Sequence, residues 1–240
     1  MTKKTRTILF SICAFLFAVT APSIIFYSQG YRLDFAARKI VQTGGLYFKV
    51  APRSAQVYIN GKPKDTTSIF TNSSLVKNLL PKTYAIEISK DGYYSWQKNL
   101  EVKEKQVTEA KNITLFPKNI NFATTSFPVP QTITSATSSD GQKVIEADQH
   151  EIWISLTKEK EKIFLVRFSE TISKVFWLND YYLIFNVGNK IKVAEIDDRD
   201  RLNVIDLAEF KTPEIFWDSA NNKLYVLSGG ALYVSEGLLP

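Results

Sequence analysis

An apolar run at residues 8–27 (ILFSICAFLFAVTAPSIIFY) constrains this chain more than any other feature of its sequence. A helix rises about 1.5 Å per residue, so this run would span roughly 30 Å, the thickness of the hydrocarbon core of a bilayer. Lys3, Lys4 and Arg6 precede it, and the positive-inside rule therefore places residues 1–7 in the cytoplasm. The sequence predicts a single-pass signal-anchor helix at 8–27, with all later residues extracytoplasmic.

Two other interpretations of this run stay open. A cleaved signal peptide usually has an apolar part of about 7–15 residues before a small-residue cleavage site. The nearest candidate here ends at Ala21, but Pro22 follows directly and the run stays apolar afterwards. The remaining interpretation is a buried helix of a soluble domain. The length of the run favours the uncleaved anchor over both.

The composition of the remaining chain limits what it can bind. The net charge is +6 with three positive charges before the apolar run, and no block of like charge follows, so we predict no nucleic-acid partner. The single cysteine, Cys13, lies inside the run, which excludes an intrachain disulfide. One histidine and one methionine exclude the commonest dense sets of metal ligands. We therefore predict no metal, no cofactor and no catalytic residues.

Residues 28–43 look like a juxtamembrane connector with partly helical character. Arg38 and Lys39 could lie near lipid headgroups, although a solvated connector accounts for them as well.

Period-two alternation dominates residues 44–117. Leu46, Phe48 and Val50 share one face of a predicted strand, and Lys49 lies on the other. Asn60-Gly61 is a strong two-residue hairpin signal, because both central positions of such a turn need a positive φ. Five or six short strands at regular spacing predict a small antiparallel β-sandwich.

This segment resembles a PEGA domain, a family named for a short proline-centred motif. The matching stretches are residues 45–50, 55–61, 80–88 and 90–93. The naming motif departs from the family, because Pro81 is followed by Lys82, Thr83 and Tyr84 rather than Glu-Gly-Ala. The resemblance implies a small extracytoplasmic β-sandwich of a bacterial surface protein, with no catalytic set to transfer.

Residues 118–133 are rich in Thr, Ser and Pro and predict a linker or an opening edge strand. An internal repeat then fills 134–240: KVFW at 174–177 returns as EIFW at 214–217, a spacing of 40. Val144, Leu183 and Leu224 are 39 and 41 residues apart, which adds a third, less regular copy. A period near 40 is typical of propeller blades with about four strands each.

The repeats resemble WD-repeat and TolB-like propellers, although no His to Trp-Asp signature is in place. Propellers close with about four to eight blades, so three copies cannot form a closed ring. We therefore expect an incomplete, open array of about three propeller-like blades. The order of anchor, PEGA-like sandwich and propeller-like repeats resembles PEGA-domain membrane proteins of bacteria.

Two clusters of polar residues are candidate sites. His150 stands near Glu146, Asp148 and Glu151, but no nucleophile or second histidine accompanies it, so we predict a solvated turn. The oxygen-rich run of Glu195, Asp197, Asp198 and Asp200 lacks the glycine and the distal glutamate of an EF-hand loop, and two arginines lie within and after it. It is predicted to be a charged turn between strands.

Aromatic residues offer the remaining candidates. Trp177 and Trp217 recur with the repeat and are predicted to pack between blades. Tyr93, Tyr94 and Trp96 are candidate ligand contacts, with stacking on sugars as one use and packing as the other.

The sequence as a whole predicts an all-β, non-catalytic, membrane-anchored protein of the bacterial cell envelope. Its expected role is binding or scaffolding, through an envelope protein partner or self-association. The alternative is a cell-wall glycan binder that uses the aromatic residues of the PEGA-like domain.

Overall fold

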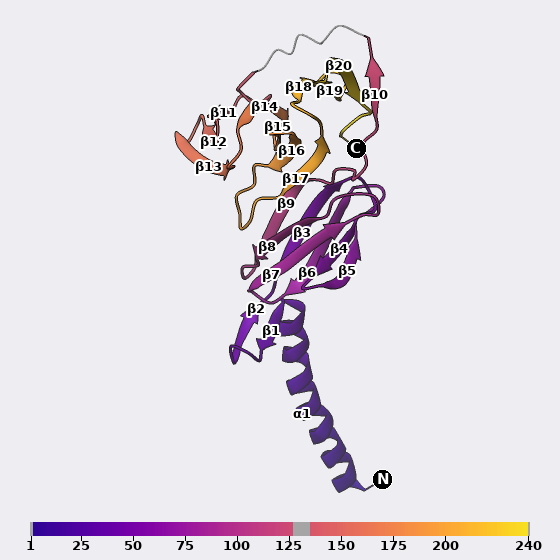
Figure 1. Cartoon of the computed structure of the whole chain (residues 1–240). Coiled ribbons are helices and arrows are strands. Elements are labelled where there is room, and N and C mark those ends of the chain that lie inside the picture. Colours follow the sequence, from indigo (N-terminus) through magenta and orange to yellow (C-terminus); the bar gives the residue numbers. More distant parts are fainter. Residues whose placement is uncertain (1, 127–134, 240) are drawn as a thin grey trace. The chain divides into compact units, whose positions relative to one another are not determined.

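The computed structural model describes residues 2–126 and 135–239, and it is mostly β structure after one N-terminal helix (Figure 1). After this helix, the described residues form small antiparallel sheets, and none of these sheets closes into a barrel or ring. The described residues fall into two compact units. The first unit comprises 1–48, 75–84 and 101–110, and the second comprises 49–74, 85–100 and 111–240. This division cuts across several strands.

The helix α1 (Lys3–Ser28) is longer than the predicted span at its N-terminal end. Thr2 caps it, because its hydroxyl accepts a hydrogen bond from the backbone N–H of Thr5 at 3.3 Å. The helix continues through Pro22, and none of its residues is buried. It is long and apolar enough to cross a membrane. The interpretation as the buried helix of a soluble domain is wrong, since α1 contributes nothing to a core.

The connector after α1 is a β-hairpin, so the expectation of partly helical structure was wrong. Strands β1 (Tyr31–Asp34) and β2 (Lys39–Gln42) pair antiparallel. Gly30, with φ of 85°, ends the helical path in a conformation that favours glycine. The carboxylate of Asp34 then accepts hydrogen bonds from the N–H groups of Ala36 and Ala37, at 3.0 and 3.1 Å, and fixes the turn.

Seven strands follow between Gly44 and Thr114, in two sheets of order β6-β3-β9 and β5-β4-β7-β8. They are β3 (Gly44–Ala51), β4 (Gln56–Ile59), β5 (Lys62–Thr66), β6 (Ser73–Leu79), β7 (Thr83–Ser89), β8 (Trp96–Glu101) and β9 (Val107–Thr114). The predicted alternation in β3 is confirmed, because Leu46, Phe48 and Val50 are buried and Lys49 is exposed. The predicted turn is confirmed as well: Asn60 and Gly61 link β4 to β5 with φ of 51° and 73°.

The repeat region forms three sheets within the second unit. The first sheet contains β11 (Lys143–Ala147), β12 (Glu151–Leu156) and β13 (Glu161–Arg167). The central sheet contains β14 (Ile172–Asn179), β15 (Tyr182–Val187), β16 (Lys190–Glu195) and β17 (Val204–Glu209). The last sheet, of order β10-β20-β19-β18, contains β10 (Phe122–Thr125), β18 (Glu214–Asp218), β19 (Lys223–Ser228) and β20 (Ala231–Ser235).

Strand β10 lies in the segment predicted as a linker or an opening edge strand. It pairs antiparallel with β20, at the far end of the sequence, and so completes the last sheet at its edge. Pro128 and Pro130, on which the linker prediction depended, lie outside the described residues.

The central sheet is buried on both faces. One face shares a core with the first sheet, in which Leu183 and Phe185 pack with Ile152 and Ile154. The other face shares a core with the last sheet through residues such as Ile184. All six residues of β15 are buried, which explains its nearly continuous apolar sequence YLIFNV. Trp177 and Trp217 each lie in one of these two cores, as their recurrence predicted.

Candidate functional site

The aromatic residues predicted as ligand contacts do not form one open face. The ring of Trp96 is buried, and its indole N–H donates a hydrogen bond to Glu195 Oε2 at 2.7 Å. Tyr94 is half-buried, and its hydroxyl donates to the carbonyl of Asp206 at 2.8 Å. Tyr93 is half-buried, with Lys90 Nζ 5.7 Å from its ring centroid. Trp96 therefore cannot stack on a sugar without leaving its hydrogen bond and its core position.

His150 lies in the turn between β11 and β12, at the predicted place. Asp148 Oδ1 accepts hydrogen bonds from the backbone N–H groups of His150 and Glu151, both at 2.7 Å, and these contacts hold the pKa of Asp148 below its ordinary value. The imidazole is half-buried rather than solvated, and within the described residues its Nδ1 has no hydrogen-bond partner. No group of three or more His, Cys, Asp or Glu residues that could hold a metal ion occurs in the part of the chain that is described.

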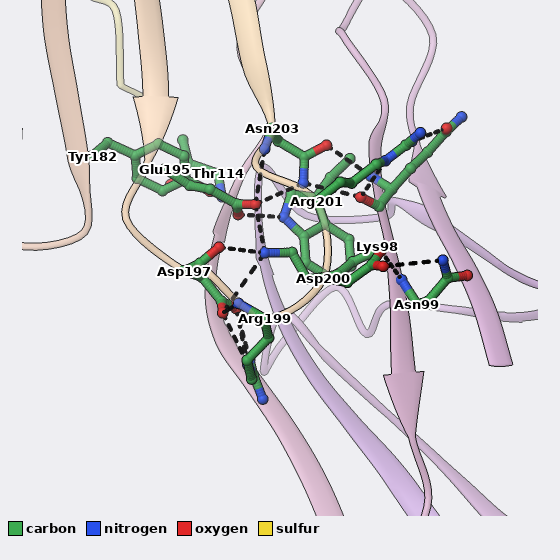
Figure 2. Close-up of polar contacts among 12 residues, drawn as sticks. Lys98, Asn99, Thr114, Tyr182, Glu195, Asp197, Arg199, Asp200, Arg201 and Asn203 are labelled. Carbon is green, nitrogen blue, oxygen red and sulfur yellow. Dashed lines mark hydrogen bonds and ion pairs between the residues drawn. The ribbon is translucent and has the colours of Figure 1, made fainter. Parts of the chain in front are cut away.

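A group of polar contacts in the second unit surrounds Lys98, a residue that the sequence analysis did not single out. Its side chain is 0% exposed, and Nζ lies 2.8 Å from Glu195 Oε1, whose side chain is 5% exposed (Figure 2). Nζ also donates to the carbonyl of Asp197 at 2.5 Å and lies 3.6 Å from its Oδ1. A buried ammonium needs such partners, because the desolvation of one unpaired ion costs on the order of several kcal/mol.

Further hydrogen bonds join the two segments that meet here, β8 and the loop between β16 and β17. Asn203 Nδ2 donates to Glu195 Oε1 at 2.7 Å and to the carbonyl of Gln97 at 3.0 Å. Asn203 Oδ1 accepts from the N–H of Gln97 at 3.2 Å. Asp200 accepts from the backbone N–H of Asn99 at 2.9 Å, as Figure 2 shows. We call these residues the Lys98 cluster: Trp96, Gln97, Lys98, Asn99, Glu195, Asp197, Arg199, Asp200, Arg201 and Asn203.

Asp197, Asp198 and Asp200 lie in the loop between β16 and β17 as predicted, but Glu195 is the buried last residue of β16 and not part of the turn. Arg199 Nη2 lies 2.7 Å from Asp197 Oδ2, and Arg201 bonds the side-chain oxygen of Gln97. Burial raises the pKa of Asp197, but the hydrogen bonds from Arg199 and the charge of Lys98 outweigh it, so the pKa lies below its ordinary value. The carboxylates of Glu195, Asp197 and Asp200 bind protein cations and N–H groups rather than presenting their oxygens to an ion.

The same pattern of satisfied groups continues beside the cluster. Tyr182 is buried, and its hydroxyl accepts a hydrogen bond from the N–H of Thr114 at 2.9 Å. Burial first, and then the charge of Glu195, raise the pKa of Tyr182 well above its ordinary value. A pocket of about 200 Å³ adjoins the cluster, which is smaller than the roughly 300–1,000 Å³ of typical ligand sites. The arrangement joins β8 to residues 195–203.

One signal in the sequence marks this cluster. Trp96, Lys98 and Leu100 alternate along β8, and all three are buried. A lysine at an inward position between two large apolar residues needs an acidic partner elsewhere in the chain. The pattern reveals that need, but it does not identify Glu195 as the partner.

Comparison with known proteins adds little to this geometry. No protein-family model matches the chain, and no curated protein matches it. Among solved structures, the crystal structure of Hsv2 from Kluyvelomyces marxianus is similar at 10% sequence identity over 78% of this chain, with a TM-score of 0.22. The chain spans about half the length of that structure (49%). A likeness at this TM-score carries no argument about fold or function.

Proposed function

We propose that this chain is a non-catalytic, membrane-anchored binding or scaffold protein of the bacterial cell envelope that acts through protein–protein interaction. In this proposal α1 is the anchor, the N-terminus is cytoplasmic and the sheets are extracytoplasmic. Residues 44–117 act as a PEGA-like sandwich, and the three sheets of the repeat region are propeller-like blades in an open array. The repeat spacing near 40 residues and the two cores on either side of the central sheet support the interpretation of these three sheets as blades.

The observation that carries the proposal is the contrast between the two outer faces of the array. In a stack of repeats, a terminal unit needs a polar outer face to remain soluble. The first sheet has such a face: Lys162 Nζ lies 2.6 Å from Glu146 Oε2 and 5.1 Å from the ring centroid of Trp153. Glu151 accepts the indole N–H of Trp153 at 2.9 Å. Polar side chains thus cover Trp153 on this face, whereas Phe164 beside it is 46% exposed.

Within residues 2–126 and 135–239, the outer face of the last sheet carries a larger set of apolar side chains. The register places five apolar side chains on the face turned away from the core, and each is half-buried: Phe216, Tyr225, Leu227, Leu232 and Val234. Lys174 covers only the rim, with Nζ 4.3 Å from the ring centroid of Phe216 and 2.7 Å from Glu214 Oε1. A continuous apolar face of this kind is typical of a surface that binds another protein.

The experiment compares one substitution on each outer face. We expect Val234→Lys in the full-length, detergent-solubilised chain to abolish recovery of a specific envelope protein, or of a second copy of the chain, in affinity capture. Ser155→Lys, on the already polar outer face of the first sheet, should leave that recovery unchanged. Circular dichroism checks that both variants keep their sheets. Equal recovery with Val234→Lys and the unsubstituted chain would count against the proposal.

The orientation needs its own test, because three basic residues precede the span and three follow it at Arg32, Arg38 and Lys39. The order of basic segment and apolar run is that of a secretory signal, which supports export. We expect Phe70→Cys in a Cys13→Ser background to react with a membrane-impermeant maleimide on intact spheroplasts, because Phe70 is 91% exposed. Reaction only after lysis would place the sheets in the cytoplasm.

A further inference from the structure

The β1–β2 hairpin presents an exposed apolar surface directly after α1. Leu33 and Ile40 are paired across the two strands and are 52% and 69% exposed. Phe35, in the turn between the strands, is 81% exposed. Val41, one position along from Ile40 and on the opposite face, is buried. One face of the hairpin is therefore packed, the other presents Leu33 and Ile40, and the turn adds the exposed side chain of Phe35.

Several contacts fix this hairpin to the end of the helix. Arg32 Nη1 donates to the carbonyl of Tyr27 at 2.8 Å, and its guanidinium carbon lies 3.5 Å from the centroid of the Tyr27 ring. The N–H of Thr43 donates to the carbonyl of Gly30 at 2.9 Å. The rings of Phe26 and Tyr31 meet edge to face, 5.5 Å apart. Since both chain ends of the hairpin are tied to residues 26–30, its exposed apolar residues are held close to the C-terminal end of α1.

The charge of the hairpin tip identifies the surface that it fits. Arg38 and Lys39 are exposed beside Phe35, whereas the carboxylate of Asp34 accepts hydrogen bonds from the turn. Apolar side chains bordered by basic ones, next to a span and its terminal Tyr27, match the boundary between acyl chains and anionic headgroups. A basic protein surface without the adjoining span would not distinguish lipid from an acidic protein, but here the span brings the hairpin to the bilayer.

We propose that the hairpin of residues 31–42 is an interfacial anchor, which inserts Leu33, Phe35 and Ile40 among anionic phospholipids while Arg38 and Lys39 contact the headgroups. The inference rests on the proposed role of α1 as a membrane span. It adds a second attachment, which holds the chain at the bilayer surface just before β3.

The depth of the hairpin tip is measured with a nitroxide label on the full-length chain in phosphatidylcholine nanodiscs that contain phosphatidylglycerol. The label is placed by Ala36→Cys in a Cys13→Ser background, which leaves Phe35 intact. We expect this label to be more accessible to oxygen than to a water-soluble nickel complex. A separate sample labelled at native Cys13, inside the span, gives the lipid reference. A label at Phe70→Cys gives the solvent reference.

Two matched variants separate the contributions of apolar and basic side chains. Phe35→Ser should shift the Ala36→Cys label toward the solvent reference in both lipid compositions. Lys39→Glu should do so with phosphatidylglycerol but have little effect in phosphatidylcholine alone.

The outcomes that overturn the inference are distinct from failure of the anchor. A solvent-like label at position 36 together with a lipid-like label on Cys13 disproves the interfacial hairpin and leaves the span intact. Shielding of position 36 from both reagents would show a protein contact instead and would equally overturn it. A solvent-like label on Cys13 would remove the membrane proposal itself.

Discussion

Replacement of Lys98 by methionine is expected to lower the free energy of unfolding by about 3–5 kcal/mol, the range for a buried ion pair that loses one partner. Methionine keeps most of the side-chain volume, so the loss comes from charge rather than from a cavity. Glu195 would remain buried, with hydrogen bonds from Trp96 and Asn203 but no cation at 2.8 Å. Urea denaturation of the detergent-solubilised chain, followed by tryptophan fluorescence, measures the change.

Two further variants make this prediction specific. Glu195→Gln added to Lys98→Met removes the unpaired charge and keeps a hydrogen-bond acceptor for Trp96, so part of the lost stability should return. Lys62→Met removes a lysine from the exposed strand β5 and should change stability by no more than about 0.5 kcal/mol. If Lys98→Met were as harmless as Lys62→Met, the buried ion pair would not exist.

The features that the sequence predicted well depend on short-range physics. Alternation of apolar residues fixes which side of β3 is buried, and the preference for positive φ fixes the turn at Asn60 and Gly61. The spacing of 40 residues placed Trp177 and Trp217 in equivalent buried positions. In each case the cause lies within a few residues or repeats itself along the chain.

The features that the sequence did not predict depend on partners far apart in the chain. Trp96 and Glu195 are separated by 99 positions, and no local pattern reports such a contact. The sequence therefore leaves two roles open for Trp96, a ligand contact and a core residue. The structure places it in a core. The strands of residues 31–42 carry charged and apolar residues in a pattern too short to separate a hairpin from a helix.

Phe185→Ala tests the packing of the central sheet and is expected to cost about 3–5 kcal/mol of unfolding free energy. Phe185 is fully buried in the middle of β15, and its ring centroid lies 5.6 Å from that of Phe168. Both faces of this sheet are covered, so the neighbours of Phe185 can collapse only partly into the space that its ring leaves. The loss of buried apolar area and the remaining cavity then add together.

Phe164→Ala is the matched control, because it removes the same ring from the outer face of the first sheet. Phe164 is 46% exposed, and its ring meets Trp153 edge to face at 5.0 Å. Its loss should cost about 0.5–1.5 kcal/mol, the range for one aromatic pair. The same denaturation measurement compares the two variants. If both variants lost similar amounts of unfolding free energy, the central sheet would be packed no more tightly than an outer face. Its position between the first and the last sheet would then be wrong.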